Sequence, residues 1–324
     1  MDNLISIIIV NWNGKQWLGK CLNSLIFQTY KKIEIILVDN NSEDDSVEFV
    51  KNGYPGVKIV SSQKNLGFAG GNNLGIDSSN GKYILLLNND TWIDAHFIEK
   101  MIDFYRNNKF DIIGPMENGY NNISKSNYIT KIDPFGHCVY SKNNIKWKKN
   151  FYLGGVCLFF EKSIYRETGG LDADFFMYFE EVDWFWRLNL LKKSFGVVDD
   201  LYVHHSGAGS TSGRTKYGSF LWRNQNTLQM LLKNYAWTSL IWVLPVYFMQ
   251  NVIEILFFLV IGQPKIAFSY PAGWWFNIKN LQSTLKKRKW VQKNRIVKES
   301  EIFKKMYFGF GKLKHLIDFY KHKT

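Results

Sequence analysis

Short, uninterrupted apolar runs alternate with segments of helical periodicity through the first part of the chain. The apolar runs lack the polar alternation of a half-exposed strand, so each is expected to be buried on both faces. Buried strands separated by helical segments are typical of a parallel sheet covered by helices, and the pattern therefore predicts an α/β fold. The predicted strands are residues 6–10, 33–38, 57–61 and 83–87, and the helices between them are residues 17–27, 46–51 and 70–78.

The pattern weakens in the middle of the chain and then returns. Residues 107–151 are polar and poorly periodic, which predicts loops and short antiparallel strands. Residues 196–203 predict a last strand that delivers His204. Residues 1–225 are therefore expected to form one α/β domain, with a mainly parallel sheet flanked by helices. Residues 226–324 are expected to form a separate helical region.

A long uncharged segment marks this second region. No charged residue occurs between Lys233 and Glu254, and the apolar run continues to residue 261, which is long enough to cross a bilayer. Pro245 and Asn251 interrupt it, and a single crossing from a cytoplasmic body would place a basic tail outside, against the positive-inside tendency. We expect a re-entrant or interfacial helix pair. The alternative is a packed helical subdomain or a dimer interface.

The net charge of +13 is concentrated near the C-terminus. Residues 279–324 contain 14 Lys and Arg against 3 Asp and Glu, whereas the rest of the chain contains 27 against 25. A uniform basic groove for nucleic acid is not indicated, and the basic region suits an anionic membrane surface instead. Three widely spaced cysteines without a Cys-x-x-Cys pair indicate a reducing compartment.

Two predicted strands end on a carboxylate. Asp39 directly follows the strand at residues 33–38, and Asp90 follows residues 83–87 after two asparagines. The carboxyl ends of parallel strands form the edge at which α/β proteins bind ligands. Asp90 is therefore a candidate metal ligand, and Asp39 is suited to accept the imino N–H of uracil, thymine or guanine. The alternative for either acid is to cap the turn or helix that follows it, which for Asp90 is a helix expected at residues 93–105.

A glycine-rich segment occupies residues 65–75, Asn-Leu-Gly-Phe-Ala-Gly-Gly-Asn-Asn-Leu-Gly. Its glycines allow the backbone to approach a ligand, and N–H groups at a helix start suit a phosphate. The segment has neither the Walker ending nor the Rossmann spacing. We expect a phosphate contact that uses neither motif.

Three carboxylates, Glu180, Glu181 and Asp183, lie within an aromatic segment. Mutual repulsion and a low local dielectric raise the proton affinity of at least one of them, which suits a general base. Alternatively, acids in a first helical turn complement the helix dipole, with Asp183 and Arg187 forming an i,i+4 ion pair.

These segments, in this order, resemble the inverting family 2 glycosyltransferases of the GT-A fold, and most closely the branch that includes bacterial rhamnosyltransferases. The resemblance covers about residues 4–225. It implies transfer of a sugar from a UDP, dTDP or GDP donor to a glycan or polyprenyl-linked acceptor, with inversion. The motifs are Val-Asn-Trp-Asn-Gly (10–14), Val-Asp-Asn-Asn-Ser (38–42), the glycine-rich segment, Leu-Leu-Asn-Asn-Asp (86–90) and Phe-Met-Tyr-Phe-Glu-Glu-Val-Asp (176–183).

The resemblance implies donor-site roles for individual residues. Asp39 matches the acid that contacts the nucleobase, and Asp90 matches the acid that holds Mn²⁺ or Mg²⁺ on the diphosphate. His204 matches a further metal ligand. The chain departs from the family's Asp-x-Asp motif at Asn88, so a second carboxylate is missing there. The remaining expected donor contacts are Val10, Asn11, Asn13, Asn65, Gly67, Asn72 and Asn89.

The resemblance also implies a base and an acceptor platform. Glu181 matches the second acid of the family's Glu-Asp motif and is the expected base, although Glu replaces Asp; Asp183 and Glu180 stay open as alternatives. Trp184 or Trp186 is expected to stack on the acceptor sugar.

Two other functional classes remain open on the sequence. A sugar nucleotidyltransferase would carry a glycine-rich loop with a basic residue after the first strand, where this chain has Asn-Trp-Asn-Gly. The hypothesis of a carbohydrate- or nucleic-acid-binding protein without catalytic activity is based on the basic tail. The expected location is the cytoplasmic face of the cell membrane, with peripheral, monotopic or re-entrant attachment, and a homodimer is left open.

Overall fold

The computed structural model describes residues 3–119, 128–142, 150–207 and 216–312, which divide by their contacts into two compact units. The first unit comprises Met1–Asn127, Leu153–Phe176 and Lys193–Gly213, and the second comprises Tyr128–Tyr152, Met177–Lys192 and Arg214–Thr324. The chain passes between the units several times, so the division by contacts does not follow one boundary along the sequence.

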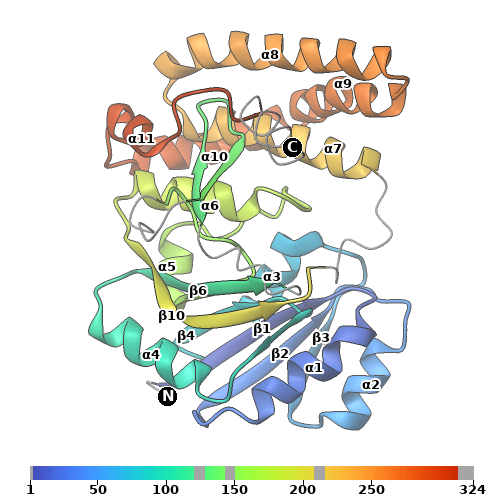
Figure 1. The fold of residues 1–324 in the computed structure, drawn as a ribbon, viewed down its shortest axis with the longest axis vertical. Coiled ribbons are helices and arrows are strands. Elements are labelled where there is room, and N and C mark those ends of the chain that lie inside the picture. The colour runs from blue at the N-terminus through green and yellow to red at the C-terminus, as the bar shows by residue number, and fades with distance from the viewer. Residues whose placement is uncertain (1–2, 120–127, 143–149, 208–215, 313–324) are drawn as a thin grey trace. The chain divides into compact units, whose positions relative to one another are not determined.

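An eight-stranded sheet in the order β3-β2-β1-β4-β9-β6-β10-β5 organises the first unit (Figure 1). The pairs β3/β2, β2/β1, β1/β4 and β6/β10 are parallel, whereas β4/β9, β9/β6 and β10/β5 are antiparallel. The sheet is thus a parallel half continued by a mixed half. The strands are β1 (Ile5–Asn11), β2 (Ile33–Asp39), β3 (Val57–Ser61), β4 (Tyr83–Leu87), β5 (Thr91–Ile93), β6 (Ile112–Gly119), β9 (Cys157–Glu161) and β10 (Phe195–His205).

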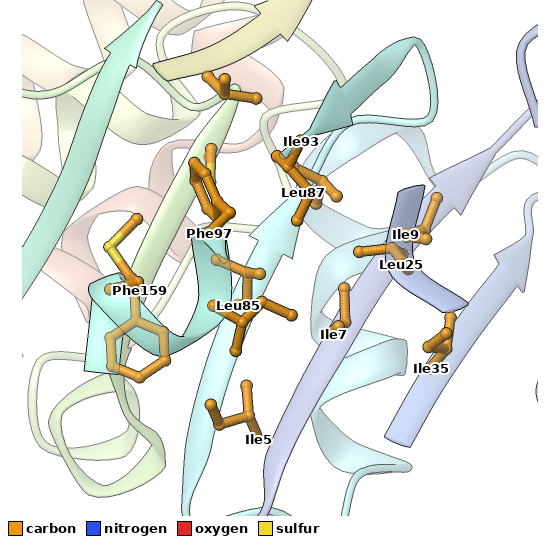
Figure 2. Close-up of a cluster of buried hydrophobic side chains, with 14 of the residues drawn as sticks. Ile5, Ile7, Ile9, Leu25, Ile35, Leu85, Leu87, Ile93, Phe97 and Phe159 are labelled. Atoms are coloured by element: carbon orange, nitrogen blue, oxygen red, sulfur yellow. The ribbon is translucent and has the colours of Figure 1, made fainter. Parts of the chain in front are cut away.

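Helices cover both faces of this sheet, as the uninterrupted apolar strands predict. Side chains of alternate residues in β1 and β4, such as Ile7 and Leu85, pack in one buried cluster with Leu25 and Phe97 (Figure 2). On the opposite face Gly75 lies so close to β1 that a Cβ there would meet Ile8 Cγ2 at 2.3 Å. The helices are α1 (Lys15–Ile26), α2 (Ser46–Gly53), α3 (Gly67–Asp77), α4 (Phe97–Asn107) and α5 (Lys162–Glu167).

The structure corrects two details of the predicted first half. The helix expected at residues 93–105 begins only at Phe97, because Thr91–Ile93 pair with β10 as an antiparallel edge strand. The polar middle section contributes β6, which pairs antiparallel with β9 and, beyond the prediction, in parallel with β10. It also contains the expected antiparallel pair, β7 (Tyr128–Ile132) with β8 (Cys138–Lys142), in the second unit.

The second unit is otherwise helical. The helix α6 (Glu180–Leu190) carries the three acids, and α7 (Lys216–Asn234) packs against α9 (Pro264–Lys279) and α10 (Leu281–Asn294). The longest helix, α8 (Trp237–Val260), runs beside α9 (Figure 1), and α11 (Glu299–Lys305) follows α10.

Candidate functional site

The carboxyl ends of β1, β2 and β4 meet at one edge of the sheet. Asn11 is the partner of Asp39 in the β1/β2 register, and Asn11 Oδ1 accepts a hydrogen bond of 2.8 Å from Asn89 Nδ2, just beyond β4. Asp39 and Asp90 are both nearly buried. The register therefore brings the two predicted acids to the same edge, with the Asn11–Asn89 hydrogen bond between their strands.

Asn11 and Asn13 hold the loops around Asp39 through hydrogen bonds to Ser42 and Glu43. The backbone N–H of Ser42 donates to both carboxylate oxygens of Asp39 at 3.4 Å. The Ser42 hydroxyl in turn accepts hydrogen bonds from Asn11 Nδ2 and from the backbone N–H of Asn13. Asn13 adopts a left-handed conformation (φ 50°), which asparagine tolerates, and its Oδ1 accepts the N–H of Glu43. These amides tie the loop after β1 to the loop after β2.

The glycine-rich segment uses its glycines for contacts within the protein. Gly67 has φ +71°, and a Cβ there would lie 2.0 Å from the carbonyl oxygen of Phe176. At Gly71 a Cβ would meet Val10 Cγ1 at 2.7 Å, so this glycine lets α3 approach β1. The missing side chains at these two positions therefore make room for Phe176 and Val10 within the protein.

The asparagines of the same segment are also engaged internally. Asn65 Oδ1 accepts hydrogen bonds from Asn40 Nδ2 and from the backbone N–H of Gly67. Asn72 is buried in α3 and donates to the carbonyl oxygen of Phe68 one turn earlier. The side chains of Asn65 and Asn72 therefore shape the segment through contacts within the protein.

The histidine that contacts Asp90 is His205. Its Nε2 lies 3.2 Å from Asp90 Oδ1, and its Nδ1 lies 2.8 Å from Glu117 Oε1. Burial alone would lower the pKa of His205, but hydrogen bonds and charges from the two carboxylates outweigh it and raise the pKa to about 9. The two carboxylates thus favour the cationic form of the His205 ring that contacts Asp90.

The structure does not place His204, the predicted metal ligand, beside Asp90. Successive residues of a strand point to opposite faces, so His204 turns away from Asp90. Its ring stacks on Trp92, with centroids 5.3 Å apart and planes 5° from parallel, and Lys20 Nζ lies 3.1 Å from the centre of the Trp92 ring.

Asp90 and His205 are the residues that fit a divalent cation. Among the residues that the structure describes, no cluster of three or more His, Cys, Asp or Glu side chains has metal-site geometry. The converging pair offers one carboxylate oxygen and one imidazole nitrogen, while Glu117 holds the other ring nitrogen, as outer-shell carboxylates do for ligating histidines. Such a set leaves most coordination positions for substrate and water, which suits Mg²⁺ or Mn²⁺.

The three acids of α6 have different surroundings within the second unit. Asp183 is fully buried and forms ion pairs with Arg187 at 3.0 Å and Lys233 at 2.9 Å. Its other oxygen accepts a hydrogen bond of 2.8 Å from Asn234 Nδ2. The alternative of an Asp183–Arg187 pair is confirmed, and a carboxylate so enclosed by cations is poorly placed to serve as a base.

Glu181 is the acid of α6 with partial exposure, while Glu180 is nearly buried. Burial raises the pKa of the Glu181 carboxyl, and the backbone N–H groups of Glu181 and Val182 oppose the shift only in part. A raised proton affinity at a partly exposed carboxylate is the property that a general base requires.

The turn that starts α6 is strained. Tyr178 (φ 72°) and Phe179 (φ 67°) are consecutive left-handed residues without the freedom of glycine. Asn226 of α7 donates from its Nδ2 to the carbonyl oxygens of Met177 (2.8 Å) and Tyr178 (2.7 Å). Asn226 thereby holds the turn that aims the first residues of α6.

The indoles of Trp184 and Trp186 are fully buried, and the prediction that they stack on an acceptor sugar is wrong. Trp186 packs edge-to-face on Tyr235, with centroids 4.7 Å apart, and on Phe151. Both tryptophans belong to the core of the second unit, because α6 is enclosed on nearly all sides.

Comparison with known proteins identifies the family of this chain. The sequence model described as "Glycosyl transferase family 2" matches residues 6–168, half of the chain. The chain belongs to glycosyltransferase family 2. The matched range includes Asp39 and Asp90 and ends before Glu181 and His205.

Curated relatives of this family 2 chain come from bacteria and archaea. Glycosyltransferase GlyA of Streptococcus pneumoniae is 33% identical over 31% of this chain and 15% of its own length. The low-salt glycan biosynthesis hexosyltransferase Agl10 of Haloferax volcanii is 26% identical over 68% of this chain and 73% of its own length. The alignments to the first three relatives span only 15%, 35% and 43% of those proteins.

Solved structures share the family 2 chain's fold at low identity. Residues 1–349 of TarS from S. aureus, in complex with UDP-GlcNAc, give a TM-score of 0.54 at 15% identity over 71% of this chain and 67% of that chain. GalNAc-T7 with UDP, GalNAc and Mn²⁺ gives 0.58 at 13% identity over 71% of this chain and 48% of that chain. The α/β glycosyltransferase fold is thus confirmed.

Sequence reasoning missed three residues that the structure adds to the candidate site, namely His205, Glu117 and Asn226. The two-residue period of β10 carries the signal for His205, because it places adjacent histidines on opposite faces. Glu117 and Asn226 carry no comparable signal, since each meets its partner only through the pairing of segments far apart in the chain.

Proposed function

We propose that this family 2 chain transfers a sugar from a nucleoside-diphosphate donor to a hydroxyl group of a glycan, with inversion at the anomeric carbon. The proposal is based mainly on the sheet edge that holds Asp39 and Asp90. There Asn11, the strand partner of Asp39, accepts a hydrogen bond from Asn89, the residue before Asp90. An edge with one acid for a nucleobase and one for a cation suits a nucleoside diphosphate.

Asp39 is proposed to read the base. The Ser42 N–H makes long contacts of 3.4 Å with both carboxylate oxygens, so acceptor capacity remains for the imino N–H of uracil, thymine or guanine. Cytosine lacks that N–H, which favours UDP-, dTDP- or GDP-sugars.

Asp90 and His205 are proposed to hold Mg²⁺ or Mn²⁺ against the diphosphate. A bound cation would neutralise the charge that develops on the leaving group, so no protein acid is needed there. For this role His205 must give up its Nε2 proton, while Glu117 keeps the ring oriented through Nδ1.

Glu181 is proposed as the base. It would accept the proton of the acceptor hydroxyl as that oxygen forms a bond to the anomeric carbon and the bond from this carbon to the diphosphate oxygen breaks. A single displacement from the opposite side inverts the configuration. Asn226 acts as a positioning residue, because it holds the turn that begins the Glu181 helix.

The acceptor is proposed to be a growing glycan, with a hexose or rhamnose as the transferred sugar and a polyprenyl carrier at the cytoplasmic face of the membrane. The relative Agl10 is a low-salt glycan biosynthesis hexosyltransferase, which supports a glycan acceptor. The apolar helix α8 supports a membrane-borne carrier.

The proposed function is tested by assaying release of UDP, dTDP and GDP from their sugars, with membrane extract as acceptor source and with Mn²⁺ or Mg²⁺. One nucleotide class is expected to be turned over, and Asp39→Asn is expected to weaken that preference because an amide cannot repeat the carboxylate's acceptor pattern. Turnover of none of the donors would contradict the proposal.

A further inference from the structure

The longest helix of the second unit exposes a stripe of large apolar side chains. Within the part of the chain that the structure describes, α8 is the one helix long and apolar enough to cross a membrane. Its residues Ile241, Ile253 and Val260 are 76%, 59% and 85% exposed. Exposed positions recur every three to four residues, so they form one face. That face comprises Trp237, Ile241, Met249, Val252, Ile253, Leu256, Phe257 and Val260.

The opposite face of α8 is buried and partly polar. Tyr247 and Asn251 are almost fully buried, and the Tyr247 hydroxyl lies 3.4 Å from the carbonyl oxygen of Asn224 in α7. Glu254, the charged residue of α8, forms an ion pair of 2.5 Å with Lys312. A bilayer-spanning helix meets lipid or apolar protein around its circumference. In contrast, α8 has one exposed apolar face and one face that packs through polar contacts within the second unit.

The neighbouring helix α9 repeats this asymmetry. Ser269 and Asn277 are buried and hydrogen-bonded to Asn224 and Gln225 of α7. Gly273 lets the two helices approach closely, since a Cβ there would lie 3.1 Å from Asn224 Cβ. On the other side of α9, the exposed apolar residues are Phe268, Trp275 and Ile278.

Positively charged side chains follow these apolar helices along the chain. Lys279 ends α9 and lies 5.2 Å from the Trp275 ring, and α10 exposes Lys286, Lys289 and Lys293 beside Trp290. Apolar side chains, tryptophans and lysines on adjoining helices match the chemistry of an anionic headgroup layer over acyl chains.

We propose that α8 and α9 lie flat in the surface of an anionic bilayer, with their exposed apolar faces inserted and the α10 lysines on the headgroups. The helices do not span the bilayer, because their buried faces carry the polar contacts to α7. The proposal rests on the proposed function only for its consequence, which is access to a lipid-linked acceptor.

The test is flotation of the purified full chain with phosphatidylcholine vesicles, with and without phosphatidylglycerol. The wild type is expected to bind vesicles that contain the anionic lipid. The double variant Ile253→Glu/Phe257→Glu should lose binding at least about tenfold, since it places charge in the inserted face. Lys286→Gln/Lys289→Gln should weaken binding by about fivefold for each lysine, and only to anionic vesicles.

The matched control is Ile26→Glu/Phe27→Glu, which puts the same two charges on exposed apolar residues of the first unit (49% and 72%). It should bind as the wild type does. Circular dichroism of each variant confirms that the fold is kept. Equal flotation of the wild type and the α8 double variant would overturn the proposal, and so would concentration-dependent dimerisation that hides the same face without vesicle binding.

The insertion depth of α8 distinguishes a helix that lies flat in the bilayer surface from one that spans the bilayer. A fluorophore on Ile241→Cys, Ile253→Cys or Val260→Cys should be quenched by lipid-borne quenchers at one shallow depth. A progression of depths through the midplane would show a spanning helix and overturn the flat orientation. Vesicle binding needs no sugar donor, so a failure of docking and a failure of the transferase activity are measured separately.

Discussion

His205 Nε2 lies 3.2 Å from Oδ1 of Asp90, whereas the preceding residue, His204, stacks on Trp92. The two histidines are neighbours in sequence and separate in role, which makes them a matched pair of variants.

Replacing His205 with Ala should lower kcat/KM by about ten- to a hundredfold, as is typical when a metal ligand or its support is removed. The same change at His204 removes the stacking contact with Trp92 and a long, exposed contact with Asp94, and should alter kcat/KM by less than about threefold. Steady-state kinetics at several Mn²⁺ concentrations measure both effects. A larger loss at His204 than at His205 would reverse the assignment.

The rate should fall on the acid side with the titration of Glu181. Burial raises the pKa of this carboxyl above its ordinary value of 4.5, and only the deprotonated form accepts a proton. The acid limb of kcat/KM against pH should therefore have its midpoint above 4.5.

The variant Glu181→Gln tests the same assignment through stability. A carboxyl with a raised folded pKa destabilises the native state above that pKa, so the amide should hold or raise the melting temperature at neutral pH while activity is lost. An active Glu181→Gln enzyme would transfer the role of base to another residue.

Asp183→Asn should destabilise the protein by about 3–5 kcal/mol, because it removes a carboxylate shared by the buried cations of Arg187 and Lys233. Urea unfolding of this variant beside Glu181→Gln gives the comparison. Equal stability of the two variants would contradict a structural role for Asp183.

Asn226→Ala should relax the left-handed turn at Tyr178 and Phe179, since the side chain that holds two of its carbonyl groups is lost. We expect kcat to fall by roughly tenfold with little change in donor KM. A loss confined to donor KM would place Asn226 outside the positioning of the base helix.

The sequence predicted the parallel half of the sheet well because its strands are short, mainly aliphatic segments bounded by turn residues, although Lys58 leaves the edge strand β3 partly exposed. The edge position of Asp39 and Asp90 follows from the same pattern. The antiparallel β5 was missed, since Thr91–Ile93 is too short to show a period and is defined only by pairing with β10.

The candidate site was less predictable where tertiary pairing decides a side chain's surroundings. Trp184 and Asp183 were expected to have functional roles because their residue types suit them, but α6 is enclosed on nearly all sides. Glu117 gained its role only when β6 paired with β10, a register that no local pattern encodes.

A nucleoside-diphosphate sugar is proposed to bind at the Asp39–Asp90 edge together with a divalent cation. A thermal-shift panel of UDP-, dTDP-, GDP- and CMP-sugars, each with and without Mn²⁺, on the wild type and on Asp90→Asn tests this binding directly. We expect a Mn²⁺-dependent rise in melting temperature for one of the first three classes, absent with CMP-sugars and lost in the variant. A rise that survives in Asp90→Asn, or that occurs with CMP-sugars alone, would contradict it.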